Sequence, residues 1–273
     1  MPDLETALRA RRDAGGRAFV PYVTGGLAVV DADLLRGLAE AGADAIEVGI
    51  PFSDPVMDGG VIQEASRLAL EGGATPSGVL ATISEADLPV PVAVMTYFNP
   101  VLHRGIERFL SEAASAGVTG AIVPDLPVDE AAEVAAACRG AGIDPVCLAA
   151  PGAPEPRLRA IAALAGGFVY CVATYGVTGE RETLAGTAEE LVGALRPLTD
   201  LPLLVGVGIG TPGQADEACA FADGVIVGSA LMRLLLEGEA EAAVALAERF
   251  RAAVPHRGIP RTGSSNGTLD SVL

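Results

Sequence analysis

The stretch 39–50, AEAGADAIEVGI, joins the end of an alanine-rich amphipathic helix, a glycine and a short run of branched apolar residues. Gly42 suits the left-handed residue that follows a helix, and the run from Asp44 to Ile50 suits a strand buried on both faces. Four other stretches repeat this order of features, at 115–125, 139–149, 164–173 and 220–230. Each stretch therefore predicts one step from a helix to a strand.

Working outward from these stretches, the sequence predicts eight strands, near residues 18–23, 44–50, 92–97, 119–124, 143–148, 167–172, 202–206 and 223–227. Helical patterns separate them, which predicts an α/β fold, a single-domain (β/α)8 TIM barrel over 1–253 with an extra amino-terminal helix near 1–12. The rival is a doubly wound open sheet, but its glycine-rich dinucleotide turn is missing. Residues 254–273 are rich in Gly, Ser and Pro and are expected to be a loosely ordered tail.

The composition excludes several classes of function. A formal net charge of -17 would repel nucleic-acid phosphates and anionic lipid headgroups, so neither nucleic acid nor membrane is expected as a partner. No secretory signal is visible, which predicts a cytoplasmic protein. Residues 160–179 carry no charge, but Gly166, Gly167 and Gly176 argue against a membrane-spanning helix.

Metal and Schiff-base chemistry also lack support. His103 and His256 have no metal-ligating neighbours at useful spacing, and the chain contains no lysine, so it cannot form a lysine Schiff base. The widely spaced cysteines are interpreted as reduced core residues: Cys138, Cys147, Cys171 and Cys219.

Glu47 is the first candidate for catalysis. A period of two places Glu47 on the opposite side of its strand from Ile46, Val48 and Ile50, so Glu47 points into the barrel if the branched side chains meet the helices. Burial raises the pKa of a carboxyl group, which suits proton exchange near neutral pH. A structural salt bridge to an arginine is the alternative.

Asp58 is the second candidate. It lies on the loop 51–60 that follows the strand of Glu47, where two prolines stiffen the first half and Gly59-Gly60 permits bending. Such a loop can place Asp58 across the barrel mouth from Glu47. Asp before Gly is also common in turns, where the side chain only bonds nearby backbone, so this alternative stays open.

Glycine-rich segments follow the last two predicted strands, at 206–210 and 224–230. Backbone amides in these two loops, beside a helix amino terminus, form the phosphate site of many barrels. Tight turns could explain either segment alone, but their joint placement favours a phosphorylated substrate. The loop 176–181, with glycines at positions 176 and 179, is typical of a mobile lid.

Several motifs together resemble the tryptophan synthase alpha subunit family. The longest is Glu47-Val48-Gly49-Ile50-Pro51-Phe52-Ser53-Asp54-Pro55 with Asp58-Gly59 and Ile62-Gln63. The resemblance continues through 19–22, 95–100, 124–127, 176–179 and 228–229, and it covers the chain to about residue 253.

This resemblance implies retro-aldol cleavage of indole-3-glycerol phosphate to indole and glyceraldehyde 3-phosphate, without a cofactor. Glu47 would transfer the protons, and Asp58 would accept the indole N–H. The residues expected to contact the substrate are Tyr22, Ile62, Tyr97, Tyr170 and Thr178, and those expected to hold phosphate are Gly179, Gly206, Gly208, Gly228 and Ser229. The implied partner is the pyridoxal-phosphate-dependent beta subunit, in an alpha2beta2 complex contacted near Asp54, Pro55, Asn99 and Pro127.

Three positions depart from the family pattern: Gly60 and Ala28 stand where the family usually has Pro, and Val207 stands where Phe is frequent. They affect loops that close and dock, so they put partner affinity in question more than the chemistry. A stand-alone lyase that releases indole and a non-catalytic activator of a beta subunit remain as alternatives. Other phosphate-binding barrels remain too, including the synthase of indole-3-glycerol phosphate, although that enzyme relies on lysines.

Overall fold

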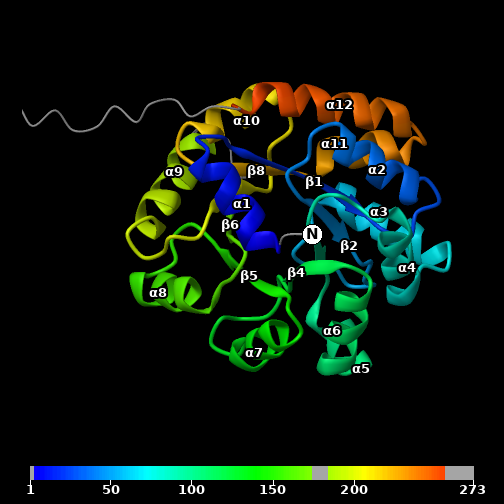
Figure 1. Cartoon of the computed structure of the whole chain (residues 1–273), viewed down its shortest axis with the longest axis horizontal. Helices are drawn as coiled ribbons and strands as arrows, with labels where there is room; N and C mark the ends of the chain where they lie inside the picture. Colours follow the sequence, from blue (N-terminus) through cyan, green and yellow to red (C-terminus); the bar gives the residue numbers. More distant parts are fainter. Residues whose placement is uncertain (1–2, 174–183, 256–273) are drawn as a thin grey trace, which may run out of the picture.

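Eight parallel strands close into a barrel in chain order, with β8 paired to β1 (Figure 1). The computed structural model describes residues 3–173 and 184–255. The strands are β1 (Ala18–Thr24), β2 (Ile46–Gly49), β3 (Val92–Met95), β4 (Val118–Ile122), β5 (Asp144–Ala149), β6 (Val169–Val172), β7 (Leu203–Gly206) and β8 (Gly224–Val227). All eight overlap the predicted strands, and the TIM-barrel prediction is confirmed.

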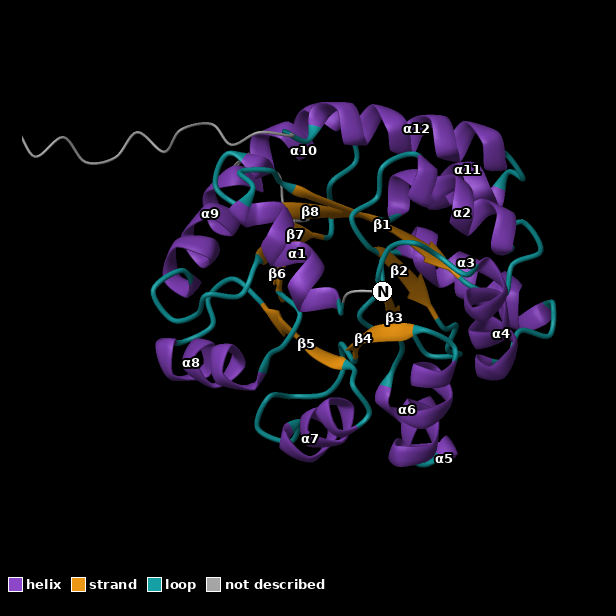
Figure 2. Ribbon diagram, in the orientation of Figure 1, coloured by secondary structure: helices purple, strands orange, loops and turns teal. Residues whose placement is uncertain are grey.

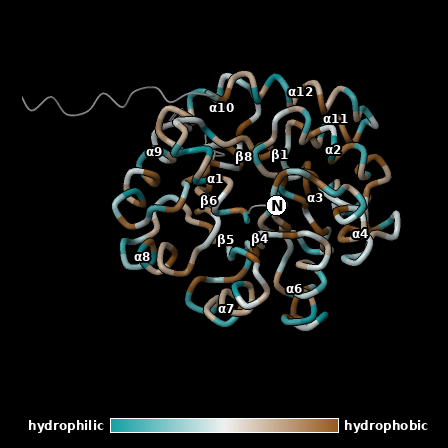
Figure 3. The backbone as a smooth tube through the Cα atoms, in the orientation of Figure 1, coloured by the Kyte–Doolittle hydropathy of each residue, from teal (hydrophilic) through white to brown (hydrophobic). Residues whose placement is uncertain are grey.

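Helices surround this ring, and α1 lies across its opening, as Figure 2 shows. They are α1 (Leu4–Asp13), α2 (Ala32–Glu40), α3 (Gly60–Glu71), α4 (Pro76–Ala86), α5 (Phe98–Arg104), α6 (Ile106–Ser115), α7 (Ala132–Gly140), α8 (Glu155–Leu164), α9 (Leu184–Leu195), α10 (Pro212–Cys219), α11 (Ser229–Leu236) and α12 (Ala240–Ala253). Hydrophobic and hydrophilic residues alternate along the outer helices (Figure 3), because each helix buries one face against the strands. Within the described ranges, no helix combines the length and apolar character needed to cross a membrane.

The glycines of the repeated stretches have two different roles. Gly42, Gly117 and Gly142 each follow the last residues of a helix with φ of 94°, 89° and 74°, as the helix-to-strand pattern predicts. The same prediction is wrong for Gly224, which is the first residue of β8. There an added Cβ would lie 2.5 Å from the Ala18 carbonyl oxygen, so this glycine allows β8 to approach β1.

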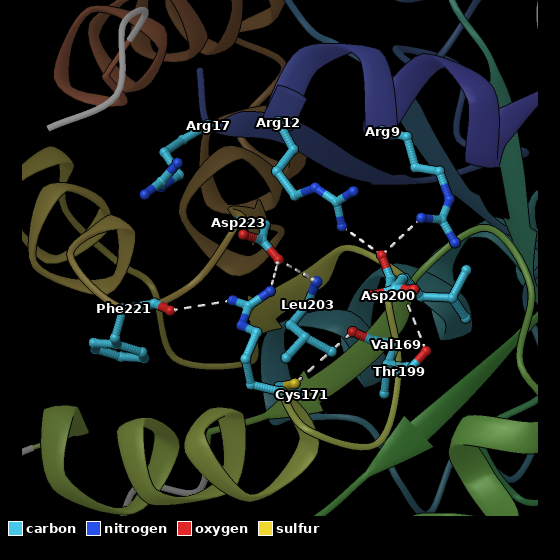
Figure 4. Close-up of polar contacts among 12 residues, drawn as sticks. Arg9, Arg12, Arg17, Val169, Cys171, Thr199, Asp200, Leu203, Phe221 and Asp223 are labelled. Atoms are coloured by element: carbon cyan, nitrogen blue, oxygen red, sulfur yellow. Dashed lines mark hydrogen bonds and ion pairs between the residues drawn. The ribbon is translucent and has the colours of Figure 1, made fainter. Parts of the chain in front are cut away.

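Helix α1 closes the amino-terminal end of the barrel. Its Leu4 side chain is fully buried, and a Cβ on Gly120 of β4 would lie only 2.4 Å from it. Polar contacts hold the helix there: Glu5 N–H donates to Asp144 Oδ2 at 2.9 Å, and Arg9 and Arg12 both donate to the Asp200 carbonyl oxygen (Figure 4). The sequence predicted this helix but not its function as a plug.

Candidate active site

Glu47 occupies the centre of β2, in register between Tyr22 of β1 and Ala93 of β3. Only 1% of the residue is exposed, and Oε2 has no hydrogen-bond partner among the described residues. Burial, and secondarily the charge of nearby Asp58, raises the pKa of Glu47 to about 8. No arginine of the described part pairs with it, so the salt-bridge alternative is not supported.

Asp58 lies on the loop between β2 and α3, and burial raises its pKa to about 6. Tyr97 limits this rise because its hydroxyl hydrogen-bonds the Asp58 carboxyl group. The same hydroxyl accepts a hydrogen bond from Met57 N–H at 2.9 Å, and the Tyr97 ring stacks on Phe52 at 5.1 Å. Tyr97 therefore fixes the loop that carries Asp58, a function that sequence reasoning missed because it saw Tyr97 only as a substrate contact.

Two buried tyrosines form walls of the barrel mouth, and each depends on a glycine. A Cβ on Gly49 would lie 2.2 Å from the Tyr22 hydroxyl oxygen, and a Cβ on Gly206 would lie 2.3 Å from that of Tyr170. The Tyr22 hydroxyl and Thr24 Oγ1 also form a hydrogen bond of 3.2 Å, which the motifs did not predict. Both phenols have raised pKa values through burial, and the charge of Glu47 contributes to each.

The tyrosine hydroxyls are therefore neutral. Because the phenols are neutral and Glu47 is largely protonated, the ionised Asp58 is the main negative charge among these side chains. This arrangement can deliver a proton and stabilise a developing positive charge.

The glycine-rich loops lie together at the carboxyl ends of neighbouring strands β7 and β8. Gly228 caps α11, whose first residue is Ser229, and Gly208 adopts a φ of 101°. Gly206 is the last residue of β7 and leaves space for the Tyr170 side chain. This is a structural reason for a glycine at this position, in addition to the predicted role in phosphate binding. Thr178, Gly179 and the expected lid at 176–181 lie outside the described residues.

The remaining predicted positions have different degrees of exposure. Ile62, on α3, is 8% exposed and belongs to the hydrophobic core. Asp54, Asn99 and Pro127 are exposed and Pro55 is half-buried. Large apolar side chains next to them are exposed as well: Val56, Met57 and Leu102.

Across the described ranges, no group of three His, Cys, Asp or Glu side chains is arranged to hold a metal ion. Cys138, Cys171 and Cys219 are buried free thiols and Cys147 is a half-buried one, in agreement with their interpretation as reduced residues. His103 is exposed on α5.

Residues 8–256 match the family model described as tryptophan synthase alpha chain. Curated alpha chains from Carboxydothermus hydrogenoformans and Streptomyces avermitilis are 44% and 43% identical, covering 82% and 88% of this chain and 86% and 88% of the relatives. A structure of Mycobacterium tuberculosis tryptophan synthase is similar at 38% identity and a TM-score of 0.84, covering 92% of this chain and 98% of that one.

Subunit alpha of the Legionella pneumophila enzyme, at 31% identity and a TM-score of 0.83, covers 93% of this chain and 98% of its own. The barrel, the buried Glu47 motif and these similarities agree. The chain belongs to the tryptophan synthase alpha chain family.

Proposed function

We propose that this lyase cleaves indole-3-glycerol phosphate into indole and glyceraldehyde 3-phosphate by acid–base catalysis without a cofactor. The observation that carries the proposal is Glu47, a carboxyl group that is 1% exposed, has an unpartnered oxygen and has a pKa raised to about 8 by burial and by the charge of Asp58. A group with this pKa is mostly protonated at neutral pH and returns easily to that state.

In the proposed reaction, protonated Glu47 gives its proton to C3 of the indole ring. The resulting carboxylate then accepts the proton of the adjacent glycerol hydroxyl, while the carbon–carbon bond breaks and its electron pair returns to the ring. One aldehyde and one indole leave, and Glu47 is protonated again. The absence of lysine is consistent with this path, because no Schiff base with a lysine of this chain is available.

Asp58 is proposed to accept the indole N–H and to stabilise the positive charge of the protonated ring. Its pKa of about 6 leaves it mostly ionised at neutral pH, unlike Glu47. Tyr22, Ile62, Tyr97, Tyr170 and Thr178 are proposed to enclose the substrate. Gly179, Gly206, Gly208, Gly228 and Ser229 are proposed to hold its phosphate, which the amino terminus of α11 would favour.

The partner is a tryptophan synthase beta subunit, and we propose an alpha2beta2 assembly in which the beta subunits alone carry pyridoxal phosphate. Val56, Met57 and Leu102 are exposed and lie within three residues of Asp54 or Asn99 in the sequence, and exposed large apolar side chains are typical of docking surfaces. Free cysteine thiols support a cytoplasmic location. The intact Glu47–Asp58 pair argues against a non-catalytic activator.

Replacing Glu47 with Gln tests the proposal most directly. Turnover of indole-3-glycerol phosphate should fall by about 10³-fold, in the range for loss of a general acid–base group, while substrate binding by calorimetry persists. Glu64→Gln on the exposed face of α3 is the matched control and should keep normal turnover. Normal turnover in Glu47→Gln would refute the assignment.

Measuring indole release with and without a beta subunit separates the paired enzyme from a stand-alone lyase. Strong stimulation by the beta subunit is expected. Equal rates would favour the stand-alone lyase, without affecting the assignment of Glu47.

A further inference from the structure

The ring of outer helices has one break, and it lies between α7 and α8. Going round the barrel, α2 packs on α4, α4 on α6 and α6 on α7; α8 packs on α9, α9 on α10, α10 on α12 and α12 on α2. No comparable packing joins α7 to α8 within the described elements, although both pack on β5, and Figure 2 shows the two helices apart.

A cavity of about 750 Å³ fills this break. Its walls include Ala135 and Cys138 of α7, Ile161 of α8 and Cys147 of β5. Such a volume is in the range of small-molecule pockets, and most of the lining side chains are apolar. Neither Glu47 nor Asp58 lines the cavity.

The inner end of the cavity reaches the mouth of the barrel. Met57, which lines the cavity, directly precedes Asp58, and its N–H donates a hydrogen bond to the Tyr97 hydroxyl. Leu148, also in the lining, is the register partner of Tyr170. The cavity therefore lies beside the loop that carries Asp58 and beside the strand position of Tyr170.

The charges of the cavity favour a neutral occupant over an anionic one. Of the lining residues only Asp125 and Arg157 are charged, and Arg157 pairs with Asp129 at 3.2 Å. Both thiols in the lining are neutral, because burial raises the pKa of Cys147 to about 11 and that of Cys138 to about 12. A phosphate ester would meet a single cation, Arg157, at the exposed end of a cavity in a chain of net charge -17, whereas a neutral aromatic ring would find apolar walls.

We propose that the cleft between α7 and α8 is a second binding site, which takes neutral indole after it leaves the barrel and rejects phosphorylated molecules. Indole as the occupant rests on the proposed function; the cleft itself does not. Its location beside Met57 and Leu148 would hold the product within reach of the mouth.

Equilibrium dialysis of radiolabelled indole tests the proposal. The Glu47→Gln chain, saturated with indole-3-glycerol phosphate to fill the barrel, is expected to retain one indole per chain. Adding Ala135→Leu, which fills the cleft, should abolish this retention, whereas Ala136→Leu on the exposed face of the same helix should not. In the otherwise unaltered chain, Ala135→Leu should leave turnover unchanged.

Indole retention that is lost on saturation with the substrate, or that survives Ala135→Leu, would overturn the proposal. A chain that neither turns over nor binds indole-3-glycerol phosphate, yet retains indole sensitive to Ala135→Leu, would refute the proposed function alone.

Thiol protection decides the case if Ala135→Leu fails to fold. In the unaltered chain, indole should slow alkylation of Cys138 and Cys147 by a neutral maleimide, while Cys219, away from the cleft, keeps its own rate. Unchanged rates at Cys138 and Cys147 would overturn the proposal.

Discussion

Glu47, inside β2, and Asp223, at the amino-terminal end of the barrel, are two buried carboxyl groups, 1% and 2% exposed. Asp223 precedes β8, and its Oδ2 accepts hydrogen bonds from Leu203 N–H at 3.0 Å and from the Arg196 guanidinium (Figure 4). Glu47 Oε2 has no such partner in the described part of the chain. An unpaired buried charge is far more costly than a paired one, so the paired Asp223 stabilises the amino-terminal end, whereas the interior of the barrel keeps at Glu47 a carboxyl group available for reaction.

The largest expected effect on stability is the pH dependence due to Glu47. Its pKa rises from 4.5 in the unfolded chain to about 8 in the folded one, so its contribution to stability is full below pH 4.5 and is lost as the pH rises through 8. The slope is about 1.4 kcal/mol per pH unit. Glu47→Gln should therefore gain stability relative to the unaltered chain, by up to about 5 kcal/mol above pH 8.

Urea unfolding of both chains at mildly acidic and at alkaline pH measures this gain. Glu64→Gln should show no such trend because its side chain is exposed. If the difference in the free energy of unfolding between Glu47→Gln and the unaltered chain did not change with pH, the pKa of Glu47 would not be raised by folding.

Asp223→Asn should act in the opposite way. It leaves Arg196 without its charged partner and should lower the free energy of unfolding by about 3 kcal/mol, at the lower end for a broken buried pair because Arg196 is partly exposed. Turnover per folded molecule should stay normal. Denaturant unfolding measures this loss of stability, with Asp216→Asn, a change at an exposed acid on α10, as the control. If Asp223→Asn lowered turnover without lowering stability, Asp223 would not differ from Glu47 in the way described.

Gly206→Ala should cost about 2 kcal/mol, because the new Cβ would overlap the Tyr170 hydroxyl. Adding Tyr170→Phe should recover part of this loss, since ring atoms at 2.6 Å would still be crowded. Gly213→Ala, on the open first turn of α10, is the control and should not destabilise the chain. Thermal unfolding of the unaltered chain, Gly206→Ala, Tyr170→Phe and the double variant measures the coupling; additive losses would show that Gly206 and Tyr170 are independent.

The smallest effect is expected at Val207, a β-branched residue with a φ of 64° that is 53% exposed. This conformation is strained for valine, and relief of the strain exceeds the entropy cost of glycine, so Val207→Gly should stabilise the chain by about 1 kcal/mol. Val207→Ala keeps most of the strain and serves as the control. Chemical denaturation that finds Val207→Gly less stable than Val207→Ala would contradict the strain.

Much of the fold could be predicted because it is repeated locally. The alternation along β2 predicted that Glu47 points to the opposite side of the strand from the branched side chains. Each helix–glycine–strand stretch could be recognised from its own residues alone. Gly224 was misassigned because its chain neighbours resemble the other stretches, while its actual constraint is Ala18, more than 200 residues away.

The parts that could not be predicted depend on contacts between distant segments. Tyr97 holds the Asp58 loop from a different strand, Gly206 is required by Tyr170, and the α7–α8 cleft arises because two helices fail to meet. None of these contacts leaves a periodic pattern in the sequence. Of the three, the contact of Tyr97 also affects a pKa of the candidate site, because it limits the rise of the Asp58 pKa.

The closure of the barrel has a consequence for how the chain is made. Of the eight barrel strands, β1 is synthesised before the others, yet one of its two neighbours is β8, and α1 contacts Asp144 and Asp200. The apolar edge of β1 must therefore wait, unpaired, until residues as late as 227 have been synthesised. During elongation, a chaperone or a strand of another nascent chain could bind to this unpaired edge.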